Sequence, residues 1–226
     1  MSAPLEGLNE QITACRRCPR LVAWREQVAT APRRAFANED YWARAVPSFG
    51  SDRAPIVIVG LAPAAHGANR TGRMFTGDRS ADVLIAALYR AGLATQPTSI
   101  TRRDGLSLIG CRMTAIAHCA PPENRPTPQE RGRCRPYLER EIALTEPSVI
   151  LALGALAWDG TLAALRALGP VPRPKPRFGH GAEVHIGAHW LIGAYHPSQQ
   201  NTFTGRLTPA MLDAVLRRAV ARVASG

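Results

Sequence analysis

The chain has 226 residues, of which 46% are hydrophobic, so it is long and apolar enough to fold around a sizeable core. It carries 28 Lys and Arg against 17 Asp and Glu, a formal net charge of +11. No stretch of about 18 apolar residues is present, which excludes a transmembrane helix. The first ten residues lack the basic-then-apolar order of a signal peptide, so we expect a soluble, cytoplasmic protein without membrane contact.

The positive charge is almost entirely arginine, since Lys175 is the one lysine in the chain. Arginine binds phosphate in a planar, bidentate manner that lysine does not share. A GC-rich genome would produce the same composition through codon usage. Composition alone therefore favours nucleic acid only modestly over other binding partners.

In chain order, residues 5–29 are expected to be helical, with a Cys-Arg-Arg-Cys-Pro turn as an interruption. A polar loop over 32–54 precedes a short β-branched run, 56–59, which is typical of a buried strand. The long loop 61–79 then leads into a helix over 80–91.

The second half continues the alternation, with a strand over 113–119 and a helix that begins after Thr127 and runs to 145. The remaining expected elements are a strand at 148–154, a helix at 155–168, two pairing strands at 183–186 and 190–194, and a final helix at 209–224. Alternating strands and helices predict an α/β fold with a mostly parallel sheet covered on both faces.

Three polar loops leave strand ends in this reading: 61–79, 120–127 and 195–207. In parallel sheets the ligand binds beyond the carboxyl ends of the strands. We therefore expect the active site where these three loops meet.

The five cysteines suggest a metal site. Cys15 and Cys18 have the spacing of a ligand pair or a redox pair, and Cys119 and Cys134 are available to complete a tetrahedral set. The wide spacing of the second pair favours an iron–sulfur cluster over a zinc ribbon, while inert buried thiols remain the alternative. Cys111 is interpreted as a core residue.

The loop 60–78 is rich in small residues that let a ligand approach the backbone. It matches neither a P-loop nor the Gly-x-Gly-x-x-Gly dinucleotide motif. Phe75 is either a stacking platform or a loop anchor, and Asp78 is either a general base or the N-cap of the next helix.

Two further polar side chains stand out in the later loops. Asn124 can donate and accept hydrogen bonds together, which suits the edge of a base, although an Asn between prolines is also a normal turn residue. His196 follows an apolar strand, where it is either a donor to a developing anion or a structural residue.

Together these segments resemble the uracil-DNA glycosylase superfamily, and most closely its family-5 branch. The resemblance lies in GLAPAAHG and NRTGRMFTGD within 60–78, CAPPENRP at 119–126, CRPYL at 134–138 and HPSQQNT at 196–202. It implies one domain over 1–226, a three-layer α/β/α sandwich with a four-stranded, mainly parallel sheet. It also implies a structural [4Fe–4S] cluster held by Cys15, Cys18, Cys119 and Cys134, which leaves Cys111 outside.

The resemblance implies a monofunctional DNA glycosylase that flips a base into a pocket and hydrolyses its glycosidic bond, leaving an abasic site. Phe75 would stack on the base, Asn124 would read its polar edge and His196 would stabilise the departing anion. Asp78 would activate or orient water, or stabilise the sugar cation.

One departure concerns the stretch just after the first strand, where several families of this superfamily place Asp, Asn or Glu. Here Leu61 and Ala62 begin an apolar run to residue 65, an absence that the family-5 branch shares. This leaves the general base open. It also suggests a roomy pocket for uracil and other deaminated bases, namely hypoxanthine and xanthine.

On the DNA side, the resemblance places the loop after His196 in the minor groove, with Gln199, Gln200 and Arg206 as contacts. Phosphate contacts are expected from Arg70, Arg73 and Arg79, each of which could equally be a solvated surface charge. The expected partner is double-stranded or single-stranded DNA, bound by a nucleoid-associated monomer. Two other hypotheses are an iron–sulfur redox-sensing DNA-binding protein without catalysis and a nucleoside hydrolase.

Overall fold

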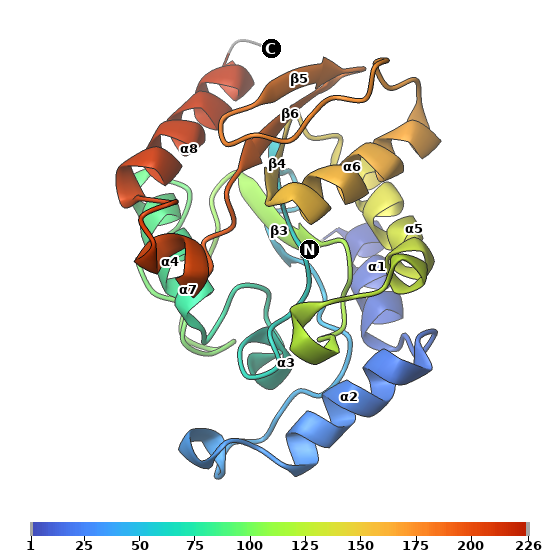
Figure 1. Cartoon of the computed structure of the whole chain (residues 1–226), viewed down its shortest axis with the longest axis vertical. Helices are drawn as coiled ribbons and strands as arrows, with labels where there is room; N and C mark the ends of the chain where they lie inside the picture. The colour runs from blue at the N-terminus through green and yellow to red at the C-terminus, as the bar shows by residue number, and fades with distance from the viewer. Residues whose placement is uncertain (1, 225–226) are drawn as a thin grey trace.

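The computed structural model describes residues 2–224, which form a mixed six-stranded sheet with helices on both faces (Figure 1). The strand order is β1-β3-β2-β4-β6-β5. The strands are β1 (Phe49–Gly50), β2 (Ile56–Gly60), β3 (Cys111–Ala115), β4 (Val149–Leu153), β5 (Glu183–Ile186) and β6 (His189–Ala194).

The four central strands, β3-β2-β4-β6, are parallel to their neighbours, as the sequence predicts. Two antiparallel edge strands extend the sheet to six: β1 pairs with β3, and β5 pairs with β6. The expected count of four strands is therefore too low. The two-residue β1 was missed because so short a pairing leaves no hydrophobic period in a polar loop.

Two helical layers cover the sheet (Figure 1). Helices α4 (Arg79–Arg90) and α8 (Pro209–Ala224) pack on one face, where Leu84, Leu88 and Leu216 are fully buried. Helices α5 (Pro128–Thr145) and α6 (Ala155–Leu168) pack on the other face. Strands β2 and β4 are buried on both faces, which explains why their sequences are continuous apolar runs.

The remaining helices are short or lie at the ends of the sheet. They are α1 (Ala3–Thr13), α2 (Pro19–Thr30), η1 (Arg34–Phe36), α3 (Ala68–Thr71), η2 (Pro122–Asn124) and α7 (Gln199–Phe203). Four of them, η1, α3, η2 and α7, lie inside segments interpreted as loops. No helix among the described residues is long and apolar enough to cross a membrane.

Local signals set several boundaries correctly. Thr127 caps α5 through a complete capping box with Glu130, and Pro128 occupies the first helical position. The strand expected at 113–119 instead ends at Ala115. The backbone N–H groups of Ile116 and Ala117 still bond to Gly60 and Leu61, and the chain then turns away toward the cysteines.

A buried ion pair joins the sheet to α5. Arg112 Nε donates to Glu141 Oε1 at 2.5 Å, and both side chains are fully buried. Ser48 Oγ bonds to Glu141 Oε2 at 2.5 Å and to Thr114 Oγ1 at 2.9 Å. This network fixes the helix that carries Cys134 against the strand that leads to Cys119.

Candidate active site

A cleft of about 880 Å³ opens at the carboxyl ends of β2, β3 and β6. Its lining includes Leu61, Asn124 and His196, one from each of the three loops predicted to meet. Its size lies within the range of small-molecule pockets. Six of the residues proposed from sequence for the base and its chemistry line it: Leu61, Ala62, Phe75, Asp78, Asn124 and His196.

Phe75 forms part of the cleft in an unusual backbone conformation. Its φ is +48°, a left-handed value that costs free energy for a bulky side chain. The ring lies against Gly60, where an added Cβ would come within 2.8 Å of Cζ. Gly60 at the end of β2 thus makes room for the Phe75 ring. The centroids of the Phe75 and His196 rings are 6.4 Å apart, and both residues line the cleft.

Asn124 ends the short helix η2, again with left-handed backbone. Glu123 and Asn124 have φ values of +54° and +56°, and Asn tolerates this region better than most residues. The backbone N–H of Asn124 donates to the Pro121 carbonyl, but within the described part of the chain no residue hydrogen-bonds to its side-chain amide. The side-chain amide is therefore free to bond to a ligand in the cleft.

His196 follows β6 and is held through its backbone. Its carbonyl accepts a hydrogen bond of 2.8 Å from Asn201 Nδ2, which ties the histidine to α7. Burial lowers the pKa of His196 to about 4, so the imidazole is neutral at neutral pH. A neutral imidazole offers one N–H donor without carrying a positive charge.

Asp78 has a structural role as well as a place in the cleft. Oδ1 accepts a hydrogen bond of 2.9 Å from Ala81 N, so the predicted N-cap of α4 is confirmed. The other oxygen lies so close to Gly67 that no Cβ would fit there. Burial raises the pKa of the carboxyl group, against the opposing effect of the Ala81 and Ser80 N–H groups. Among the described lining residues, Asp82 is the one other carboxylic acid.

Two arginines predicted on the DNA surface are instead held inside the protein. Arg70 is 8% exposed, pairs with Glu39, donates to the carbonyls of His66 and Gly77, and lies over the Phe36 ring. Arg73 is 5% exposed and donates to Asp104. Both guanidinium groups are committed to protein partners, which corrects the expectation that they face phosphate.

The other expected DNA contacts lie at the surface. Arg79 is exposed at the cleft, and Gln199 and Gln200 line its edge from α7. Arg206 is also exposed and stacks on Tyr195, although it does not line the cleft. Phe203 was not predicted as a site residue, yet its side chain is 71% exposed at the end of α7.

A second feature missed from the sequence is a group of aromatic rings, of which Phe36 and His66 line the cleft. The Tyr41 hydroxyl bonds to His66 Nδ1 at 2.8 Å, and the Phe36 ring stacks on His66 with centroids 6.2 Å apart. Both rings come from the segment interpreted as a polar loop. Its concentration of aromatic residues was the available signal.

The four cysteines proposed as ligands line one small cavity between the α1–α2 turn, α2 and α5. They come from the α1–α2 turn, the segment after β3 and α5: Cys15, Cys18, Cys119 and Cys134. Burial raises the pKa of Cys119 to about 11 and that of Cys134 to about 12. Cys111 lies apart in the main core, as predicted, with its Sγ 3.4 Å from the Leu93 carbonyl.

Arg25 shows that this cavity suits a negatively charged group. The side chain is 1% exposed, and Nη1 donates to Cys119 Sγ at 2.9 Å. No carboxylate in the described residues forms an ion pair with it. A buried cation without an anion is costly, and thiolates holding a metal cluster would supply that anion.

The fold is α/β, and its cleft lies beyond the carboxyl ends of parallel strands, where proteins of this class bind their ligands. The family model described as the uracil DNA glycosylase superfamily matches residues 47–219. The chain belongs to this superfamily.

Three relatives, each called a type-5 uracil-DNA glycosylase, are similar over nearly the whole chain. The Mycobacterium bovis protein is 57% identical over 215 residues, which cover 94% of this chain and 79% of the relative. The Thermus thermophilus protein is 48% identical, with 95% and 96% covered. The Pyrobaculum aerophilum protein is 44% identical, with 93% and 90% covered.

Proposed function

We propose that this protein is a monofunctional DNA glycosylase that flips uracil out of DNA and hydrolyses its bond to the sugar, leaving an abasic site. The observation that carries the proposal is the meeting of Phe75, Asn124, His196 and Asp78 in one cleft. The names of the three relatives support uracil as the base and DNA as the polymer.

Base recognition is assigned to the aromatic and amide side chains. A base inside a duplex cannot reach a cleft, so the nucleotide must leave the stack. Phe75, fixed by Gly60, offers a ring for the flipped base, and the unpartnered Asn124 amide can donate and accept along the base edge.

When the bond to the sugar breaks, its electron pair stays with the base, and the negative charge is shared between the ring nitrogen and the carbonyl oxygens. His196 is assigned to donate a hydrogen bond to that anion, in the manner of an oxyanion hole. Because the imidazole is neutral, it stabilises the anion by hydrogen bonding and not by an ion pair. Asn201 holds its backbone in place through the 2.8 Å bond to the carbonyl.

Asp78 is assigned to orient the attacking water or to stabilise the sugar cation. The carboxylate is fixed by the Ala81 N–H and by Gly67, so its position does not depend on substrate. Leu61 and Ala62 add no polar group to the wall beside it. Such a wall discriminates weakly, which supports release of hypoxanthine and xanthine as well as uracil.

We also assign a [4Fe–4S] cluster to Cys15, Cys18, Cys119 and Cys134. The cavity they line and the buried Arg25 cation support the assignment. Across the described residues, no three Cys, His, Asp or Glu side chains converge as ligands of one metal ion. A cluster several atoms wide holds its thiolates farther apart than a single ion does. When bound, it would join α1, α2 and α5 as a structural crosslink.

The expected substrates are double-stranded and single-stranded DNA containing the damaged base. The exposed Arg79 and Arg206 would bind backbone phosphates of DNA whatever its sequence, which makes the affinity for DNA dependent on salt. One chain contains every proposed chemical group, so a monomer suffices.

The decisive experiment incubates the protein with a duplex carrying one U·G pair, followed by alkali cleavage. We expect strand breaks at the uracil position, and duplexes with hypoxanthine or xanthine measure the breadth. DNA binding without any abasic site would instead favour the redox-sensing alternative. Iron analysis should give about four irons per chain, with loss of iron in Cys119→Ser.

Asp78→Asn tests the role of the carboxylate while keeping an oxygen that caps α4. Wild-type single-turnover rates should fall as the pH drops through the pKa of Asp78, which lies above the usual Asp range. The Asn variant should be slow and lose this pH dependence. A near-native rate in Asp78→Asn would reject the role in water activation.

A further inference from the structure

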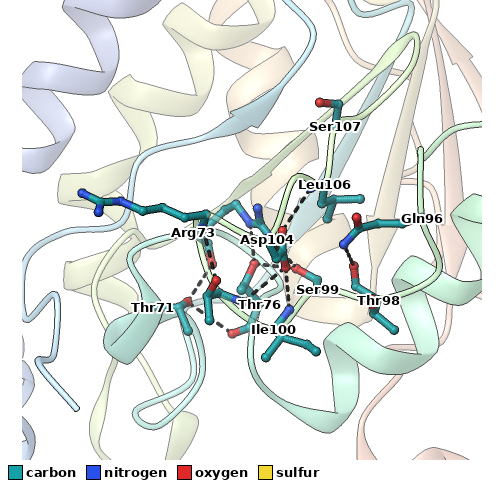
Figure 2. A network of polar contacts seen from close by, with 12 residues as sticks. Thr71, Arg73, Thr76, Gln96, Thr98, Ser99, Ile100, Asp104, Leu106 and Ser107 are labelled. Carbon is teal, nitrogen blue, oxygen red and sulfur yellow. Dashed lines mark hydrogen bonds and ion pairs between the residues drawn. The ribbon is translucent and has the colours of Figure 1, made fainter.

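A loop outside the three loops predicted from sequence to form the cleft is hydrogen-bonded to the loop 60–78. The segment 98–104, which we call the 98–104 loop, is part of the connection between α4 and β3. Ser99 O accepts from Gly77 N at 2.8 Å, and Ser99 Oγ bonds to Thr76 Oγ1 at 2.7 Å (Figure 2). The residue after Gly77 is Asp78, so the 98–104 loop is fixed directly beside the proposed catalytic carboxylate.

Asp104 makes this loop rigid. Its carboxylate accepts from Ile100 N at 2.7 Å, Leu106 N at 3.0 Å and Arg73 Nη2 at 2.8 Å (Figure 2). Burial opposes ionisation, but the Leu106 N–H and the Arg73 guanidinium outweigh it and hold the pKa of Asp104 below its usual value. The loop therefore presents its outer side chains in a defined position.

The first outer side chain is Ile100, which is 61% exposed and lines the cleft. Its backbone N–H is bonded to Asp104, and its carbonyl lies close to Gly77. A large apolar side chain that is exposed at the cleft has no role in the core. It offers an apolar surface to whatever enters the cleft.

Two residues farther on, Arg102 lies over the Trp42 indole, with Cζ 4.6 Å from the ring centroid. Arg44 approaches the same ring at 5.6 Å. Trp42 is fixed by bonds from its N to Arg70 O and from Nε1 to Ala45 O, and by contact with Gly72. Within residues 2–224 neither arginine forms an ion pair, so two cations share one ring without an anion.

We infer that the 98–104 loop is a second DNA-binding arm, in which Ile100 packs on the sugar beside the flipped nucleotide and Arg102, supported by Trp42 and Arg44, binds a phosphate of the same strand. This rests on the proposed function for the position of the DNA. An apolar tip beside a cation matches the alternation of sugar and phosphate along one strand. The arm is separate from the loop after His196, which approaches from α7.

The test uses a short duplex carrying a tetrahydrofuran abasic-site analogue, which binds without turnover. Fluorescence anisotropy measures affinity from low to high salt for Arg102→Ala, Ile100→Ser and the control Arg166→Ala. Arg166 is exposed on α6, outside the cleft lining, and its loss changes the net charge equally.

Arg102→Ala should weaken binding and make the slope of log affinity against log salt shallower by about one. Ile100→Ser should weaken binding about threefold or more with an unchanged slope, because an apolar contact releases no counterion. If Arg102→Ala has the same salt slope as Arg166→Ala, or if Ile100→Ser binds DNA like wild type, the proposal that the 98–104 loop binds DNA is rejected. Absence of uracil release by the wild type is a different result, which rejects the proposed function and leaves these slopes measurable.

Discussion

The floor and the rim of the cleft use similar residue types in opposite ways. We call the lining residues Phe75, Asp78 and His196, together with the neighbouring buried Arg73, the floor: they are held by close packing or backbone hydrogen bonds, and Arg73 is paired with Asp104. We call the exposed side chains around the cleft the rim: Arg79 lines the cleft, and Phe203 lies at the end of α7, outside the described lining. The side chains of the floor are therefore held in fixed positions by the protein itself, while those of the rim are free to contact a polymer. Changes in the floor should therefore affect stability or chemistry, and changes in the rim should affect DNA affinity.

Arg73→Ala should give the largest effect on stability. The change leaves the Asp104 carboxylate, with a side chain 12% exposed, without its cation. Breaking a buried pair in this way costs about 3–5 kcal/mol of unfolding free energy, measured by urea denaturation. The exposed Arg79→Ala is the matched control and should lie within about 0.5 kcal/mol of wild type. Equal stability of the two variants would contradict the division between floor and rim.

His196→Ala should give the largest effect on chemistry. Loss of one donor to a developing anion slows single-turnover base release about 10²–10³-fold. Affinity for the abasic-site analogue should stay close to wild type, because the floor does not hold the phosphates. A loss of affinity as large as the loss of rate would show that His196 binds DNA instead.

The same histidine links stability to pH. Its pKa is about 4 in the folded protein against 6.5 for the free side chain, so the unfolded chain takes up a proton first as the pH falls. The stability contributed by the neutral imidazole is thus present above about pH 6.5 and is lost as the pH falls toward 4. Urea midpoints of wild type should decrease more over this interval than those of His196→Gln. Parallel pH curves would mean that burial does not hold the imidazole neutral.

The sequence predicted the central sheet and both helical layers, because those depend on local signals. The meeting of the three loops followed from the topology of a parallel sheet, and the individual cleft residues came from the resemblance to a known family. The apolar run of β2 and the Thr127 capping box are complete within a few neighbouring residues. The burial of Arg73 is different in kind, since its partner Asp104 lies 31 residues away in another loop. The five-residue α7 likewise has no helical period that could show which side chain it exposes.

On the rim, Phe203→Ala tests whether the exposed aromatic side chain fills the space left by a flipped base. Stacking of one base on an aromatic ring contributes about 1–3 kcal/mol, so base release from a duplex should slow about tenfold. Release from single-stranded DNA should change little, because no partner strand has to be held apart. Comparison of the two substrates at equal protein concentration measures the difference. Equal slowing on both would reject the role as a wedge.

Arg79→Ala should give the smallest effect and the one most specific to the rim. Arg79 begins α4 one residue after Asp78, so it shares the backbone of the floor, yet its side chain is exposed. If it binds one phosphate, its loss makes the salt slope of DNA affinity shallower by about one and leaves the rate at saturating DNA unaltered. A slower rate at saturation with an unchanged slope would place Arg79 with the floor. In that case Asp78 and Arg79 would both act on chemistry, and the boundary between floor and rim would not lie between these two adjacent residues.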